Sequence, residues 1–149
     1  MSPRYFILLA IALAACTCAF AADLTPVGTW TTIDDATGKP KSIVQITERD
    51  GKLEGKVLHV LDSENGPHPI CKECKDERKD QPIEGMTILW DVVKNGDVWD
   101  DGHILDPHNG KTYKVKLSMA DNGQKLDVHG YIGVALLGRS QMWERRPEQ

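Results

Sequence analysis

Residues 113–132 read YKVKLSMADNGQKLDVHGYI, and this stretch decides the fold. Apolar residues occupy every second position over residues 113–119, and polar residues fill the positions between them. The same period of two, with one glycine, returns over residues 126–132. Such alternation places one face of a strand in a core and the other in water. Asn122-Gly123 lies between the two runs and tolerates the positive φ angles of a tight turn, so the stretch predicts an antiparallel hairpin.

Strand-like runs continue on both sides of this hairpin. A third alternating run contains Met86, Ile88, Trp90 and Val92. Shorter runs occupy residues 28–33, 42–47, 53–61, 98–105 and 140–145. Asp50-Gly51 and Asn95-Gly96 add two further hairpin turns. About eight short strands joined by turns predict an all-β domain, which as an antiparallel barrel would leave no free sheet edge.

Two segments depart from the strand pattern. Residues 62–84 are polar and contain three prolines, and a loop of this length is unusual in a compact domain. It is expected to be a lid, a binding loop or a disordered excursion. Residues 131–137 are apolar and broken by glycine. They are expected either to cover a barrel mouth or to form a hairpin crossing that caps the core.

The N-terminal segment has the pattern of an export signal. Arg4 is followed by an apolar run, and small residues precede a cleavage position before Ala22. This predicts a signal peptide over residues 1–21 and a mature domain over residues 22–149, in the periplasm or secreted. Leu13-Ala14-Ala15-Cys16 offers an alternative, because it resembles the lipobox of a bacterial lipoprotein. Cleavage there would leave an outer-membrane lipoprotein anchored by acyl chains at Cys16.

Composition narrows the range of functions. The chain has 149 residues and a formal net charge of -4, so it is long enough for one domain and too acidic for a general binder of nucleic acid. Removing residues 1–21 takes away one arginine and no acidic residue, which makes the mature domain more acidic still. It also takes away both phenylalanines, so the four tryptophans become the large apolar anchors. No span that could cross a membrane as a helix remains after the signal.

A series of short motifs resembles a known family. They begin with Gly28-x-Trp30 and include the Cys71-x-x-Cys74 pair. Further matching pieces are Thr37-Gly38-Lys39-Pro40, Asp50-Gly51-Lys52-Leu53-x-Gly55, Pro82-x-x-Gly85-Met86, Trp99-x-x-Gly102, Ile104-Leu105-Asp106-Pro107, Gly110-Lys111-x-Tyr113, Gly130-Tyr131-Ile132-Gly133, Leu137-Gly138-Arg139 and Gln141-x-Trp143-x-Arg145. Their order and number resemble domain-of-unknown-function family 2147, a group of exported bacterial proteins.

The resemblance implies a single lipocalin-like, calycin-type barrel of up-and-down topology, and it implies no activity. In lipocalins, a Gly-x-Trp on the first strand packs across the barrel base near a basic residue of the last strand. Gly28 and Trp30 match these positions, and either Arg139 or Arg145 supplies the basic residue. The indole face can hold a guanidinium by cation–π attraction, so this signature concerns packing and carries no chemistry.

Cys71-Lys72-Glu73-Cys74 has three interpretations. Export to an oxidising compartment favours a disulfide that pins the long loop. A zinc site is an alternative, in which His68 and His59 join the two cysteines. A thiol redox site is a third, although thioredoxin-like motifs place the first cysteine at a helix N-terminus and prolines precede this one.

A second polar cluster contains Asp100, Asp101, His103, Asp106 and His108. Its residue types suit a divalent metal or acid–base chemistry, but the turn after Asp106 explains much of the pattern. Ser118, Ser140 and His129 are interpreted as ordinary strand residues. The sequence has no nucleophile elbow and no phosphate-binding glycine loop, so we expect a protein that is not an enzyme and needs no cofactor.

These observations predict a non-enzymatic binder of a small hydrophobic or amphipathic ligand inside the barrel. The ligand would contact interior side chains, expected to be Met86, Ile88, Trp90, Tyr113, Val115, Leu117, Leu126 and Val128. Two alternatives stay open: an envelope structural or interaction module with a filled barrel, and a metal or thiol protein centred on the cysteine loop. The sequence names no partner and no oligomeric state.

Overall fold

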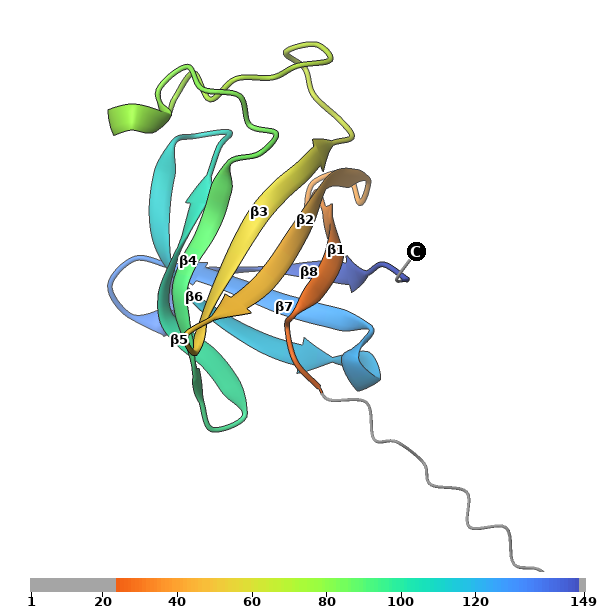
Figure 1. Cartoon of the computed structure of the whole chain (residues 1–149), viewed down its shortest axis with the longest axis vertical. Helices are drawn as coiled ribbons and strands as arrows, with labels where there is room; N and C mark the ends of the chain where they lie inside the picture. Colours follow the sequence, from red (N-terminus) through yellow and green to blue (C-terminus); the bar gives the residue numbers. More distant parts are fainter. Residues whose placement is uncertain (1–23, 148–149) are drawn as a thin grey trace, which may run out of the picture.

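The structure is a computed structural model that describes residues 24–147. Eight antiparallel strands follow one another around a closed barrel, each paired with its neighbours in sequence, and β8 pairs with β1 (Figure 1). The fold prediction is therefore confirmed. The strands are β1 (Gly28–Ile33), β2 (Pro40–Arg49), β3 (Lys52–Val60), β4 (Thr87–Asn95), β5 (Val98–Asp106), β6 (Lys111–Ala120), β7 (Lys125–Tyr131) and β8 (Arg139–Arg145).

Three short 3-10 turns lie between strands: η1 (Asp76–Arg78), η2 (Asp121–Gly123) and η3 (Ala135–Leu137). No helix within residues 24–147 is long and apolar enough to span a bilayer. The predicted signal peptide and the lipobox cysteine lie outside the described residues.

The predicted central hairpin is β6–β7. Val115 pairs with Gly130 and Leu117 with Val128, so the apolar positions of both strands share one face. That face is the interior of the barrel, where Val115 and Leu117 are fully buried. The alternation in the sequence therefore translates directly into one wall of the core, and the turn predicted at Asn122-Gly123 is the η2 turn.

Strand β4 departs from its predicted alternation. Its pairing with β3 shifts register around Gly55, and Asp91 adopts a left-handed φ of 58°. Leu89 and Val92 consequently fill the core with no exposed surface. Trp90 is half-buried and stacks on His103 of β5 instead. Irregularities of this kind change which side chains face inward, so Trp90 packs at the edge of the core cluster and Val92 lies within it.

The two ends of the barrel differ in the length of their connections. In an up-and-down barrel every second connection lies at the same end. Residues 34–39, 61–86, 107–110 and 132–138 connect strands at one end, which we call the lid end. The other end holds the turns at 50–51, 96–97 and 121–124, together with the start of β1 and the finish of β8. In Figure 1, residues 61–86 form the long yellow-green segment above the strands.

The end opposite the lid is closed by Trp30 and Arg145. Trp30 is fully buried, its Nε1 donates to Pro26 O at 2.8 Å, and the Arg145 guanidinium carbon lies 4.3 Å from its ring centroid. Arg145 also donates to the carbonyl oxygens of Gly123, Val27 and Thr25, at 2.6, 3.0 and 2.7 Å. The guanidinium thus ties the β1 entry to the η2 turn.

Gly28 makes room for that guanidinium. A Cβ at this position would lie 2.6 Å from Arg145 Nη1, and the backbone φ is 140°. Of the two arginines that the resemblance left open, Arg145 therefore fills the role. Arg139 lies at the lid end, where its Nε donates to Asp35 Oδ2 at 2.5 Å. This hydrogen bond and the charge of Asp35 raise the pKa of Arg139.

Candidate functional site

The long connection between β3 and β4, residues 61–86, is an ordered segment. Cys71 and Cys74 are joined by a disulfide with their Cα atoms 5.3 Å apart, and both residues are buried in the core cluster. Backbone hydrogen bonds close the segment on itself: Cys71 N donates to Gln81 O at 2.9 Å, and Ile83 N to Pro69 O at 3.0 Å. The segment is folded against the barrel and is called the lid below; its role as a lid or as a binding loop stays a prediction.

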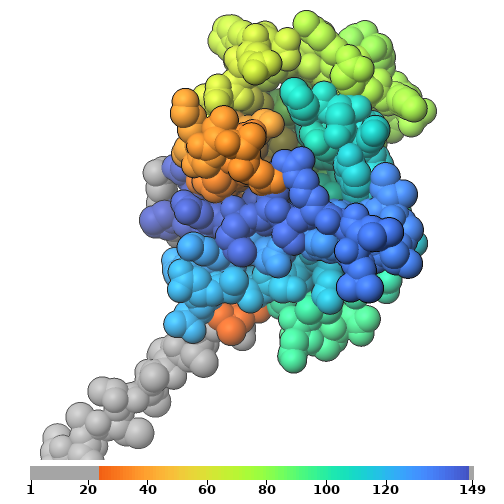
Figure 2. Space-filling model, turned by 180° about the vertical axis from the view of Figure 1, so that it is seen from behind, coloured from red at the N-terminus to blue at the C-terminus, as the bar shows by residue number. Residues whose placement is uncertain are grey.

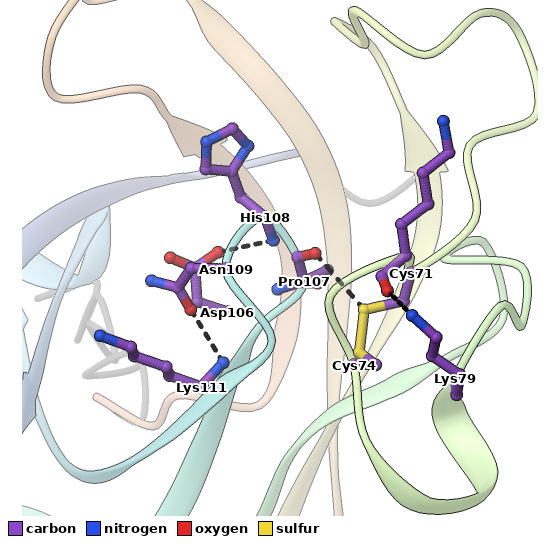
Figure 3. Close-up of a disulfide and its surroundings, with 9 residues drawn as sticks. Cys71, Cys74, Lys79, Asp106, Pro107, His108, Asn109 and Lys111 are labelled. Carbon is purple, nitrogen blue, oxygen red and sulfur yellow. Dashed lines mark hydrogen bonds between the residues drawn. A yellow bond between two sulfur atoms is a disulfide. The ribbon is translucent and has the colours of Figure 1, made fainter.

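The disulfide rests against the turn between β5 and β6 (Figure 3). Cys71 Sγ lies 3.4 Å from Pro107 O. This is a van der Waals contact and not a hydrogen bond, because a disulfide sulfur carries no hydrogen. The approach is closest at Gly110, where a Cβ would lie 1.8 Å from Glu73 O. The turn itself is shaped by Asp106 Oδ1, which accepts a hydrogen bond from His108 N at 2.9 Å. The lid is therefore in close contact with the β5–β6 turn.

A second attachment holds the lid at its return to the barrel. Glu84 Oε1 accepts a hydrogen bond from Val60 N at 3.0 Å and lies 3.8 Å from His59 Nδ1. Gly85 N donates to Val57 O at 2.7 Å. The return end of the lid is thus bonded to β3, and at its other end Leu61 N donates to Lys41 O of β2 at 2.8 Å.

A groove of about 440 Å³ opens between the lid and β4. Its lid side includes Arg78, Pro82 and Met86 together with the carboxylates of Glu77 and Glu84, and its barrel side includes Thr87 and Trp90. The Arg78 guanidinium carbon lies 4.6 Å from the Trp90 ring centroid, and no carboxylate of the described chain forms an ion pair with it. The groove therefore combines an aromatic surface with a cation that has no ionic partner within residues 24–147.

Arg78 was missed by the sequence reasoning. It lies in a loop without periodicity, 12 residues before Trp90, and no local pattern connects the two. Only the folding of the lid over β4 brings the guanidinium to the indole.

The eight residues predicted to contact a ligand in the barrel have different surroundings. Six are buried within one contiguous apolar cluster, namely Met86, Ile88, Val115, Leu117, Leu126 and Val128. Tyr113 is half-buried toward the lid end, and its hydroxyl accepts a hydrogen bond from Asn109 Nδ2 at 3.1 Å. Trp90 lies at the edge of the apolar core cluster, where its side chain lines the groove. Five of the buried six contact other side chains of the core, whereas Met86 and Trp90 also border the accessible groove.

The structure does not bring the predicted metal ligands together. Within residues 24–147, no group of three or more His, Cys, Asp or Glu side chains is placed to hold a metal ion. Cys71 and Cys74 are bonded to each other, so in this state neither sulfur is a thiolate that could bind zinc; the thiol redox alternative stays a prediction. In the second cluster, His103 stacks on Trp90 at 5.8 Å and Asp106 shapes its turn, so these side chains serve separate local structures.

His129 and Ser140 do more than the sequence indicated. Their side chains are 2.9 Å apart, between His129 Nδ1 and Ser140 Oγ, across the β7–β8 pair. His129 Nε2 lies 2.5 Å from Ala135 O and must donate to it, because a carbonyl oxygen only accepts. The histidine therefore holds the β7–β8 connection in place.

That connection does not cap the core. Ile132, Val134, Leu136 and Leu137 are exposed, so the expectation that residues 131–137 cap the core was wrong. This segment presents its apolar side chains outward.

The chain is similar in sequence to a protein family and in structure to a solved protein. The sequence matches the model of a family described as an uncharacterized protein conserved in bacteria (DUF2147), over residues 28–145. Among solved structures, it is similar to protein HP1028 from the human pathogen Helicobacter pylori, described as belonging to the lipocalin family, with a TM-score of 0.70. The two chains are 22% identical, and the match covers 82% of this chain and 83% of the other. No curated protein matches the sequence significantly.

Proposed function

Because the chain belongs to the DUF2147 family of uncharacterized bacterial proteins and closes into a lipocalin-like barrel, we propose that it is a non-enzymatic binding protein for a small amphipathic ligand. The ligand site is the groove between the lid and β4, not the barrel interior. The observation that carries this proposal is the Arg78–Trp90 pair at the wall of an accessible 440 Å³ space. The space is shallow and open to solvent, so the ligand would lie against the surface of Trp90 and would not be enclosed.

The chemistry of the groove defines the class of ligand. Trp90, Pro82 and Met86 offer apolar surface, against which a flat hydrocarbon or aromatic group can be buried. Arg78 offers fixed N–H donors that suit a carboxylate, sulfonate or phosphate group. A ligand with one apolar face and one anionic group would place the first against Trp90 and the second at Arg78. Glu77 and Glu84 also line the groove, so the anionic group would have to contact Arg78 alone.

A pair of related fluorescent probes tests this site. The anionic dye 1-anilinonaphthalene-8-sulfonate and its uncharged analogue N-phenyl-1-naphthylamine are titrated against wild type, Trp90→Ala and Arg78→Gln. Trp90→Ala is expected to weaken both probes by about tenfold, the effect of losing most of one aromatic contact. Arg78→Gln is expected to weaken the anionic dye more than the uncharged one.

The matched control is Lys94→Gln. Lys94 Nζ lies 5.5 Å from the ring centroid of Trp99, so this variant removes a cation from another tryptophan away from the groove. It should leave both probes unaffected. Equal affinity of the probes for wild type, Trp90→Ala and Arg78→Gln would refute the groove as the site.

The proposal includes export. The signal-like residues 1–21 support it, and the Cys71–Cys74 disulfide is compatible with an oxidising compartment. Mass spectrometry of protein from the periplasmic and membrane fractions distinguishes the two products. A soluble chain beginning near Ala22 supports the signal peptide, and a diacylated chain beginning at Cys16 supports the lipoprotein. A full-length chain confined to the cytoplasm contradicts export.

A further inference from the structure

The β7–β8 connection, residues 132–138, is an exposed apolar loop. Four of its side chains are large and apolar, and their exposed fractions run from 59% for Val134 to 96% for Leu136. The loop contains no charged residue. It projects in blue from the right-hand edge of the barrel in Figure 2. The surface of a soluble protein rarely has so much exposed apolar area in one short segment, so the exposure indicates contact with a membrane or with another protein.

The backbone of this apolar loop is held in a defined shape. His129 Nε2 donates to Ala135 O at 2.5 Å, and Leu137 N donates to Val134 O at 3.1 Å. Gly138 lies so close to β7 that a Cβ there would be 2.5 Å from Gly130 O. Leu136 and Leu137 therefore point outward from a bonded turn, with no groove of the described chain to receive them.

The barrel wall at the base of the loop is cationic and aromatic. Lys114 pairs in register with Tyr131, and Lys116 pairs with His129, so both lysines lie on the same outward face as these two rings. Tyr131 stacks on His129 with the ring centroids 5.9 Å apart. Both lysines are exposed, and within residues 24–147 neither forms an ion pair.

This arrangement favours a lipid surface over a protein surface. Exposed leucines, a tyrosine at their base and lysines behind it follow the order of a bilayer interface, from acyl chains to headgroups. Lysine is depleted from protein–protein interfaces, whereas it is attracted to anionic lipid headgroups. We propose that the apolar loop inserts into the surface of an anionic bilayer while Lys114 and Lys116 contact the headgroup phosphates.

The orientation leaves the lid groove accessible. In the closed order of strands, β7 and β8 lie across the barrel from β3 and β4, which carry the lid. A barrel docked through its β6–β7 wall would thus keep the groove facing water. The membrane contact and the ligand site are independent, and either can fail without the other.

Cosedimentation of the mature chain with vesicles tests the proposal. Vesicles of phosphatidylethanolamine with phosphatidylglycerol are compared with vesicles of phosphatidylcholine. Wild type is expected to bind the anionic vesicles more tightly. Leu136→Ser combined with Leu137→Ser should weaken binding by at least tenfold, because each leucine loses its apolar transfer into lipid. Lys114→Gln combined with Lys116→Gln should weaken binding about tenfold on anionic vesicles alone.

Two further variants make the test specific. Leu61→Ser removes another half-exposed leucine, in the lid, and should bind vesicles like wild type. Leu136→Trp places an indole on the loop, and its emission should shift to shorter wavelength with anionic vesicles. Surface substitutions at such exposed positions change folding little, which circular dichroism verifies.

The proposal is overturned by any of three results. The first is vesicle binding that is unchanged in the leucine variant, and the second is an emission of Leu136→Trp that does not shift. The third is a dimer in solution that the leucine variant abolishes and that does not bind vesicles, which would make the loop an interface between copies of this chain.

Discussion

Replacing Gly110 with alanine should dislodge the lid. Gly110 has a φ of 69°, and a Cβ added there would lie 1.8 Å from Glu73 O and 2.8 Å from Cys74 N. Real Cβ atoms essentially never come closer than 3.0 Å to another heavy atom, so the lid must move by at least about 1.2 Å, the difference between these distances. The obstructing atoms belong to the backbone beside the disulfide and cannot rotate away. The lid must therefore lift from the turn as a unit.

Gly38 provides the matched control. It also has a φ of 69° and lies in another turn at the lid end, but no heavy atom is within 4 Å of its Cβ position. Gly38→Ala therefore measures the cost of the left-handed backbone alone, about 1–2 kcal/mol. Gly110→Ala carries that cost and the strain of overpacking, about a further 1–3 kcal/mol. The difference between the two free energies of unfolding isolates the seating of the lid.

Urea unfolding of both variants provides these free energies. Reduction of the Cys71–Cys74 disulfide by dithiothreitol reports the lid directly, since both cysteines are buried when the lid is seated. We expect faster reduction, and faster tryptic cleavage within the lid, in Gly110→Ala than in Gly38→Ala. Equal losses of stability and equal reduction rates in the two variants would show that the lid does not depend on contact with the β5–β6 turn.

Three other outcomes are expected. Arg145→Gln should lower the free energy of unfolding by about 3 kcal/mol in a thermal or urea melt, because three carbonyls lose a charged donor. Arg139→Gln, at an exposed ion pair, should lower it by less than about 1 kcal/mol. Similar losses in both variants would contradict the role of Arg145 in closing the barrel base. Gly55→Ala should cost about 1–3 kcal/mol by crowding a buried leucine 2.9 Å away, and a stability like wild type would contradict the tight β3–β4 contact. The hydrogen bond from Lys52 holds the pKa of Asp91 below 3.8. The stabilisation from this pair is therefore present at neutral pH and is lost as the pH falls through that lowered pKa. An NMR titration in which Lys52→Gln leaves the midpoint of Asp91 unchanged would refute the role of Lys52.

The lid and the apolar loop explain different aspects of the molecule. The lid is held against one edge of the barrel by its disulfide, by the close contact of Gly110 with the Glu73 backbone, and by paired backbone hydrogen bonds. The apolar loop uses one histidine to hold leucines away from the core. The two connections lie at the same end of the barrel, yet one is packed inward and the other is presented outward.

Much of the fold was predictable because its signal is local. The period of two at Val115 and Leu117, and the turn at Asn122-Gly123, depend on residues that are adjacent in the chain. The alternation expected for β4 is interrupted at its neighbouring strand: the pairing with β3 shifts register beside Gly55, where Leu89 approaches closely. The sequence pattern of β4 alone contains no sign of that shift.

By itself, the sequence determined an all-β barrel with a long tethered loop, since alternation, turn residues and paired cysteines act over short separations. Only the tertiary structure decided that Arg145 and not Arg139 covers Trp30, that Arg78 reaches Trp90, and that Leu136 faces outward. Each of these depends on which connection lies beside which strand once the barrel closes. Side chains far apart in the chain meet there through a geometry that the spacing of residues does not encode.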